Sequence, residues 1–144
     1  MWADTLLAAE RAHLLRLLAW AASSVLVGTA LLAIAGTRAA DRGLLRHFAV
    51  QMAAWGVVEG AIAATAWRSL ALRDYIGAMR LDRTLWLAVG LDAGYISIGA
   101  TLAVAGWTLA RHAGAVGAGT AIVVQGCALL ALHLLLLSVT MRFA

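Results

Sequence analysis

Charged residues make up only 12% of the 144 residues, and the sequence contains no proline, no lysine and a single cysteine. Hydrophobic residues account for 64% of the chain, and its mean hydropathy is +0.91. A soluble domain of this length leaves roughly a third of its unfolded-state surface in contact with water. So few polar residues cannot cover that surface, which excludes a soluble domain and indicates an integral membrane protein.

The single cysteine, Cys127, excludes an internal disulfide and lies inside an apolar run, as a small packed residue does. Several motifs of catalysis are also missing. The sequence has no serine nucleophile motif, no zinc-binding HExxH, no CxxC pair and no phosphate-binding glycine loop. No nucleophile stands out, so the sequence leans away from an enzyme.

The basic charge comes from eleven arginines, which with seven acidic residues give a formal net charge of +4. These arginines lie between apolar runs, and no RNA- or DNA-binding signature accompanies them. The lipid bilayer is therefore the expected partner, through its headgroups, and nucleic acid is not.

Four apolar segments are long enough for the ~20 residues that a membrane-spanning helix needs. Their alanine and leucine content favours helices over the strands of a barrel. The sequence thus predicts an all-α integral membrane four-helix bundle, with residues 1–144 as a single transmembrane domain. The predicted spans cover residues 14–36, 44–67, 84–109 and 114–141. Leucines at helical spacing in residues 4–16 predict that the first helix extends along the interface.

Two short segments indicate an internal duplication, because ALLAIAG (residues 30–36) resembles ATLAVAG (residues 100–106) at an offset of 70 residues. In the second span a glutamine precedes a glutamate by eight residues. In the fourth span a glutamine precedes a histidine by eight residues, at an offset of 74. These matches predict two tandem helical hairpins that enter from the same side, as in parallel transporter repeats. Chance similarity between alanine-rich helices explains the same matches, so both interpretations stay open.

The distribution of arginine predicts the orientation of the chain. Seven arginines fall on the side of the two termini and four on the other side. Because cytoplasmic loops carry an excess of arginine, both termini are predicted to be cytoplasmic. The seven are Arg11, Arg16, Arg68, Arg73, Arg80, Arg83 and Arg142.

Polar residues within the spans fall at matched depths when each helical residue is given its rise of ~1.5 Å. Glu59, Asp92 and His133 each lie nine residues from an arginine at the inner boundary, or about 13 Å inside it. Ser24 lies eight residues from Arg16 and joins this layer. Each of the four helices is therefore expected to contribute one polar side chain to a common level.

This layer is the candidate ligand-binding site. A charged side chain at the bilayer centre costs at least ~2.5–3.5 kcal/mol on insertion scales, and two close carboxylates share a proton or capture a cation. Glu59 and Asp92 together with His133 suit a metal cation, an organic cation or a proton relay. The alternative is a polar clasp, in which these groups only hold the helices together through hydrogen bonds that average ~0.6 kcal/mol.

A second polar layer is expected farther out. Gln51 and Gln125 each lie seventeen residues from their inner arginine, or about 25 Å. Tyr95 lies between the two layers, and Trp55 shares one helix face with Gln51 and Glu59. These residues are candidates for the walls of a path that leads to the inner layer.

Three short motifs carry a resemblance: QMAAWG (residues 51–56), LDAGYI (residues 91–96) and VQG (residues 124–126). They resemble a family of small bacterial four-span membrane proteins of unknown function. The resemblance covers the last three helices. It implies a four-helix fold in the bacterial inner membrane, and it carries over no activity and no catalytic residue.

The leading hypothesis is a multi-pass inner-membrane protein whose Glu/Asp/His layer binds or conducts a cation, a proton or a small amphiphilic substrate. One alternative is an accessory or structural subunit of a homo-oligomer or a larger membrane complex. Another is haem or other tetrapyrrole binding through His47 or His133. The predicted depths of these two histidines differ by about 18 Å, so one haem cannot join both within a protomer. The sequence leaves the cofactor open, and a metal cation at Glu59, Asp92 and His133 is one candidate.

Overall fold

The computed structural model describes residues 2–37, 42–109 and 111–142. Its four helices are α1 (Trp2–Thr37), α2 (Arg42–Arg68), α3 (Tyr75–Thr108) and α4 (Ala113–Thr140). All four are long and apolar enough to cross a membrane, and the described residues contain no strand. The prediction of an all-α four-helix protein is therefore confirmed.

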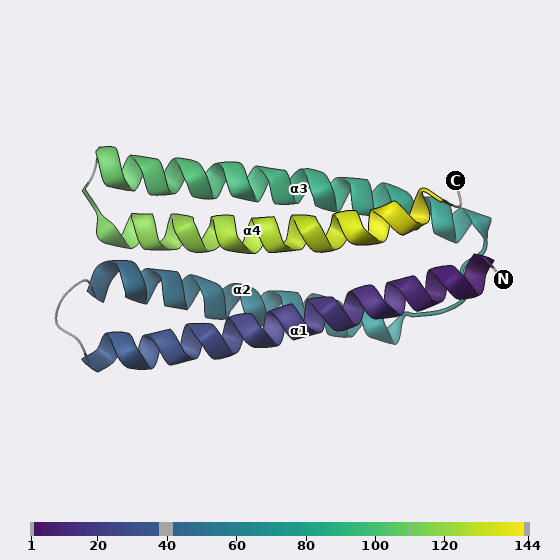
Figure 1. Cartoon of the computed structure of the whole chain (residues 1–144), viewed down its shortest axis with the longest axis horizontal. Coiled ribbons are helices and arrows are strands. Elements are labelled where there is room, and N and C mark those ends of the chain that lie inside the picture. The colour runs from purple at the N-terminus through teal and green to yellow at the C-terminus, as the bar shows by residue number, and fades with distance from the viewer. Residues whose placement is uncertain (1, 38–41, 110, 143–144) are drawn as a thin grey trace.

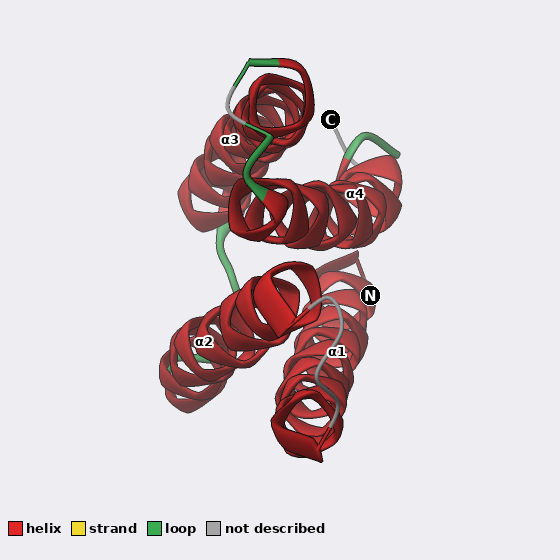
Figure 2. Cartoon of the chain, turned by 90° about the vertical axis from the view of Figure 1, so that its left-hand side faces the viewer, coloured by secondary structure: helices red, strands yellow, loops and turns green. Residues whose placement is uncertain are grey.

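The helices form two hairpins, α1 with α2 and α3 with α4, which stack as two layers (Figure 1 and Figure 2). The start of α1 and the end of α4 lie at one end of the bundle, and the end of α1 lies beside the start of α2 at the other (Figure 1). Helix α4 is the central element, because it packs against each of the other three helices. In the described part of the chain, the backbone of α3 packs closely only against α4. Polar residues of α4 are therefore the ones best placed to link the helices.

Close packing within each hairpin depends on glycine. A Cβ atom on Gly28 of α1 would lie 2.7 Å from the carbonyl oxygen of Ala49 on α2, which is too close for any real side chain. In the second hairpin, a Cβ atom on Gly99 would lie 2.8 Å from the carbonyl oxygen of Gly119. A Cβ atom on Gly117 of α4 would overlap the backbone of α2, so glycine also brings the two hairpins together. Small residues allow this approach between membrane helices.

Capping residues fix where α3 and α4 begin. The Asp74 carboxylate accepts a hydrogen bond of 2.7 Å from the Gly77 backbone N–H. His112 accepts one of 3.1 Å from the backbone N–H of Ala115 through its Nδ1 atom. Both side chains satisfy a backbone donor that has no partner inside the helix. Arg111 adopts the left-handed conformation, with φ of 49°, in the tight connection before this second cap.

Two helices extend beyond the predicted spans at the end of the bundle that carries the termini. Helix α1 begins at Trp2, where the leucine spacing of residues 4–16 predicts a helical extension. Helix α3 begins at Tyr75, nine residues before the predicted start of its span at residue 84. The added residues include several arginines and acidic residues, which lower the hydropathy without opposing helix formation. Hydropathy therefore marks the apolar part of α3 and misses its first turns.

The outward faces of the helices suit contact with lipid. Large apolar side chains are exposed on all four helices, for example Leu26, Ile62, Leu87 and Leu135. Exposed hydroxyl groups bond to the backbone of their own helix, as the Thr101 hydroxyl does with the Ser97 carbonyl oxygen at 2.8 Å. Such faces carry few polar groups that would need water.

Candidate functional site

Buried polar residues from three helices gather around the second half of α4. Asp92 on α3 is 3% exposed and Glu59 on α2 is 7% exposed, while His133 on α4 is partly buried. The Nδ1 atom of His133 lies 2.6 Å from the Oδ2 atom of Asp92, which makes an ion pair when the imidazole is protonated. Asp92 and His133 also act electrostatically on the Glu59 carboxyl group. The structure thus places Asp92 and His133 in direct contact, with Glu59 within electrostatic range of both.

Glu59 differs from the other two because neither of its carboxyl oxygens has a hydrogen-bond partner among the described residues. Most buried polar groups in proteins do have one, and an ionised carboxylate without a partner in an apolar environment is costly. One turn along α2, Ala63 packs against Leu14 and Leu17 of α1, so apolar side chains close that side. Glu59 is therefore the member of the cluster with unused capacity for a proton or a cation.

A second histidine belongs to the cluster, and the sequence analysis did not single it out. His13 on α1 is 5% exposed, and its ring centroid lies 5.4 Å from that of His133. Its Nδ1 atom has no hydrogen-bond partner in the described part of the chain. The sequence analysis assigned residues 4–16 to the interface and so passed over it. The signal was the spacing of Leu6, His13 and Leu17, which places the histidine on the apolar face of α1.

The outer glutamine on α4 links three helices. The Oε1 atom of Gln125 accepts a hydrogen bond of 2.6 Å from Trp20 Nε1 on α1. Its Nε2 atom donates to Ser24 Oγ at 3.1 Å and approaches Met52 Sδ on α2 at 3.5 Å. Ser24 is thus placed with this glutamine, whereas the depth count placed it in the layer of Glu59. The count failed on α1 because a long arginine side chain can reach the interface from a deeper backbone position, so it is a poor depth mark.

Two further predicted site residues, Trp55 of α2 and Tyr95 of α3, contact each other. The rings of Trp55 and Tyr95 meet edge to face, with centroids 5.3 Å apart and an interplanar angle of 70°. This contact connects two helices whose backbones do not pack closely. Gln51 is half-buried and takes no part in the hydrogen bonds of Gln125. The two predicted glutamines are therefore not joined by a hydrogen bond, although Met52, the neighbour of Gln51, contacts Gln125.

The described residues contain no group of three or more His, Cys, Asp or Glu side chains positioned to hold a metal ion. Asp92 and His133 pair with each other, and Glu59 is a neighbouring acid. The three side chains are therefore not a ready set of metal ligands. His47 lies near the hairpin turns, where its ring centroid is 6.4 Å from that of His112. A metal or tetrapyrrole site thus stays a prediction from the sequence.

A fully satisfied acid at the end of the bundle provides a contrast to Glu59. Glu10 on α1 is 5% exposed and accepts two hydrogen bonds from Arg73, of 2.6 Å from Nε and 2.8 Å from Nη2. These bonds tie the connection between α2 and α3 to α1. They also raise the pKa of Arg73 above its ordinary value, because the carboxylate stabilises the charged guanidinium.

Comparison with known proteins places this architecture in a family. A model described as a family of unknown function (DUF6992) matches residues 16–134. The chain belongs to this family. The region that matches DUF6992 contains Glu59, Asp92 and His133 and begins after His13. The expected resemblance to a small four-helix family of unknown function is confirmed. No curated protein and no solved structure gives a significant match, so DUF6992 membership brings no activity with it.

Proposed function

We propose that this chain is a multi-pass protein of the bacterial inner membrane, with both termini in the cytoplasm, and that it binds a proton or a small cation at Glu59. The site belongs to a binding or transport function. The observation that supports this most directly is the buried Glu59 carboxyl group, which has no hydrogen-bond partner among the described residues and lies beside the Asp92–His133 pair.

The same observation argues against a purely structural clasp. A clasp gains stability from hydrogen bonds between helices, as Gln125 does through its contacts with Trp20 and Ser24. Glu59 makes no such bond among the described residues. Burying a polar group that stays unsatisfied lowers stability, and acidic residues inside membrane bundles typically mark ion or proton pathways.

Among the cations considered, the geometry favours a proton. The Asp92 carboxylate is already engaged by His133 at 2.6 Å, which leaves fewer ligands for a metal ion. The two imidazole rings of His133 and His13 then continue the cluster from α4 to α1. In this proposal a proton bound at Glu59 passes to these neighbouring side chains, as in the relays of membrane pumps.

Proton flux through the reconstituted protein tests this function. Purified protein is placed in liposomes that enclose a pH-sensitive dye, and a potassium gradient with valinomycin sets the membrane potential. We expect dye-reported proton entry above that of empty liposomes, and a return to the empty-liposome rate for Glu59→Gln.

The matched control is Asp82→Asn, which makes the same carboxyl-to-amide change outside the cluster and is expected to keep the wild-type rate. A Glu59→Gln protein that folds normally and carries protons at the wild-type rate would rule out the proposal. Infrared difference spectra across a pH titration give a second readout. A titrating carboxyl band should disappear in Glu59→Gln.

A second candidate, an accessory subunit or a homo-oligomer, is favoured by one surface of α3. Gly90 and Gly94 are exposed, and a Cβ atom added at either would meet no atom within 4 Å. The pair has the GxxxG spacing that lets two membrane helices approach closely. This role is compatible with a proton site inside each protomer.

A further inference from the structure

A pocket between α2, α3 and α4 lies at the end of the bundle opposite the start of α1 (Figure 1). Its volume is about 330 Å³, within the range of about 300–1,000 Å³ that is usual for small-molecule sites. Leu44 and Leu45 line it from α2, Trp107 from α3 and Val116 from α4. Arg111, in the connection between α3 and α4, also lines it. The pocket is therefore separate from the cluster of Glu59, which contributes none of its lining.

The lining of this pocket is basic at the end of the bundle and apolar farther in. Arg111 lies outside the helices that are long and apolar enough to cross a membrane. Leu44 lies beside Gly117, and Val116 lies beside Gly106. Gly117 is four residues beyond the first residue of α4, which places it about 6 Å deeper along the helix axis. A bound molecule would therefore have its charged group at Arg111 and its apolar part toward the membrane core.

Arg111 is positioned by an aromatic ring and has no carboxylate partner. Its guanidinium carbon lies 5.8 Å from the centroid of the Trp107 ring, within the range of a cation–π contact. It takes part in none of the ion pairs found among the described residues. Its backbone has a φ of 49°, in the left-handed region that glycine adopts more readily than arginine. The position thus carries a guanidinium at a conformational cost, and that group stays available for an anion.

The charges around this pocket also favour an anion. Arg111 is the only charged residue among those that line it in the described part of the chain. Arg46, which follows Leu45 on α2, is exposed. In the sequence, the segments 38–46 and 109–112 carry four arginines and a single acidic residue, Asp41. An anion bound at Arg111 would therefore lie in a basic environment.

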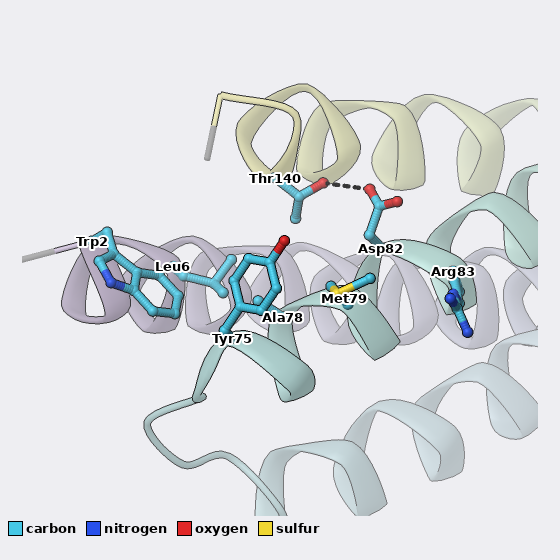
Figure 3. Close-up of a pocket in the computed structure, with 8 residues that line it drawn as sticks. All are labelled: Trp2, Leu6, Tyr75, Ala78, Met79, Asp82, Arg83 and Thr140. Carbon is cyan, nitrogen blue, oxygen red and sulfur yellow. Dashed lines mark hydrogen bonds between the residues drawn. The ribbon is translucent and has the colours of Figure 1, made fainter. Parts of the chain in front are cut away.

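A larger pocket, at the end of the bundle where α1 begins, differs in both respects (Figure 3). Its volume is about 570 Å³, and its lining includes Asp82, which accepts a hydrogen bond of 3.3 Å from the Thr140 hydroxyl. A carboxylate in the lining disfavours an anion. Its apolar wall includes Trp2, the first residue of α1, which lies at the end of the helix and not deeper in the membrane. Arg83 in this lining is therefore a matched control for Arg111.

We propose that the pocket between α2, α3 and α4 binds one anionic phospholipid, such as phosphatidylglycerol. The Arg111 guanidinium pairs with the phosphate, whose oxygens match its planar set of donors. The first part of one acyl chain lies against Leu44, Leu45 and Val116, and the rest stays in the bilayer. Trp107 lies at headgroup level, where tryptophan is enriched in membrane proteins. A zwitterionic headgroup would add an ammonium group, which meets no carboxylate in this lining.

Native mass spectrometry of the purified, delipidated full chain tests the proposal, whichever way the bundle faces in the membrane. Phosphatidylglycerol and phosphatidylethanolamine with identical acyl chains are titrated separately. We expect one bound phosphatidylglycerol per chain, with an affinity about fivefold above that of phosphatidylethanolamine. Arg111→Gln should weaken phosphatidylglycerol binding by about tenfold, as expected when one charged hydrogen bond is lost. The same variant should bind the two lipids equally.

Two further variants keep the result interpretable. Arg83→Gln makes the same change at the opposite end of the bundle and should bind like the wild type. Ala113→Phe, at the exposed first residue of α4, fills the pocket without altering a charge and should abolish the single bound lipid. Equal affinity for the two lipids in the wild type, unchanged binding in Arg111→Gln or Ala113→Phe, or equal losses in Arg83→Gln and Arg111→Gln would overturn the proposal. Competition by glycerophosphoglycerol, the headgroup without chains, would also overturn it, because the ligand would then not be a bilayer lipid.

Discussion

Glu59 and Gln125 are both buried and polar, but Glu59 is a candidate binding group and Gln125 has a structural role. Gln125 is 2% exposed and its side chain contacts Trp20, Ser24 and Met52. Glu59 is 7% exposed, and its carboxyl oxygens bond to none of the described residues. The two residues are thus similarly buried, but Gln125 is hydrogen-bonded and Glu59 is not. The same replacement should therefore change the free energy of unfolding in opposite directions at the two positions.

Methionine substitution at both positions is the first prediction. Glu59→Met removes an unsatisfied buried group and keeps a similar volume, so it should raise the free energy of unfolding by about 1–3 kcal/mol. Gln125→Met strips the Trp20 and Ser24 side chains of a partner and should lower it by about 1 kcal/mol. Reversible unfolding in mixed detergent micelles measures both. Loss of stability in Glu59→Met would mean that the carboxyl group makes bonds in the native membrane and would support the clasp.

At the scale of residues, the sequence was sufficient for part of the site. Equal distance from flanking arginines predicted one level for Asp92 and His133, whose side chains do meet in the structure. The same count misplaced Ser24 and gave no reason to include His13. Helix α1 begins at Trp2, so Arg16 lies well inside the helix and is a poor depth mark.

At the scale of elements, helix pairing depends on a few glycines. Other glycines of the same helices lie on exposed surfaces and contact no neighbouring helix. A Cβ atom on Gly119 would lie 2.5 Å from both the Ala103 nitrogen and the Gly99 carbonyl oxygen of α3. A Cβ atom on Gly90 would meet nothing within 4 Å. The sequence shows both as glycines in alanine-rich helices, so only the structure distinguishes a packing glycine from an exposed one.

Alanine substitution of these glycines is the second prediction. Gly119→Ala should force α3 and α4 apart and lower the free energy of unfolding by about 1–3 kcal/mol, as overpacking does. Gly90→Ala is the control, and its better helix propensity should leave stability unchanged or raise it by up to about 1 kcal/mol. Thermal unfolding of the two variants in the same detergent makes the comparison. Equal destabilisation by both would contradict the packing of α3 on α4.

The exposed glycine pair of α3 leads to the third prediction. If α3 docks on a second copy through this surface, Gly90→Leu combined with Gly94→Leu should shift the protein in detergent from dimer to monomer. Light scattering coupled to size-exclusion chromatography measures the mass. Gly36→Leu is the matched control, because that glycine is equally open at the end of α1. A wild-type protein that is monomeric at all concentrations in nanodiscs would exclude the homo-oligomer.

At the scale of the whole molecule, the two hairpins repeat the same contacts. Gly28 packs on Ala49 in the first hairpin, and Gly99 packs on Gly119 in the second. The offsets between the paired positions are 71 residues (28 to 99) and 70 residues (49 to 119). They agree with the offset of 70 between ALLAIAG and ATLAVAG, and differ from the offset of 74 between the polar pairs.

A second pair of contacts follows the same register. A Cβ atom on Gly56 would lie 2.7 Å from the Ala21 carbonyl oxygen, and one on Gly126 would lie 3.2 Å from that of Asp92. The packing supports a tandem repeat of hairpins, which stays a prediction. In this register Glu59 corresponds to Leu129, seventy residues later. The second hairpin therefore has no equivalent of Glu59, and the polar cluster occurs once although the hairpin packing occurs twice. The function proposed for Glu59 therefore belongs to the asymmetric interface between hairpins.

Orientation in the membrane is the last prediction, and it follows from the shape of the whole bundle. Because α1 begins and α4 ends at the same end of the bundle (Figure 1), one measured terminus fixes the side of every connection. The arginine excess at the terminal end places that end in the cytoplasm. A C-terminal green fluorescent protein should therefore fluoresce, and alkaline phosphatase fused there should be inactive. Fusion of alkaline phosphatase after Thr108, at the end of α3, should be active, whereas fusion after Leu72, before α3, should not. Activity of the C-terminal or Leu72 fusion with inactivity of the Thr108 fusion would reverse the orientation.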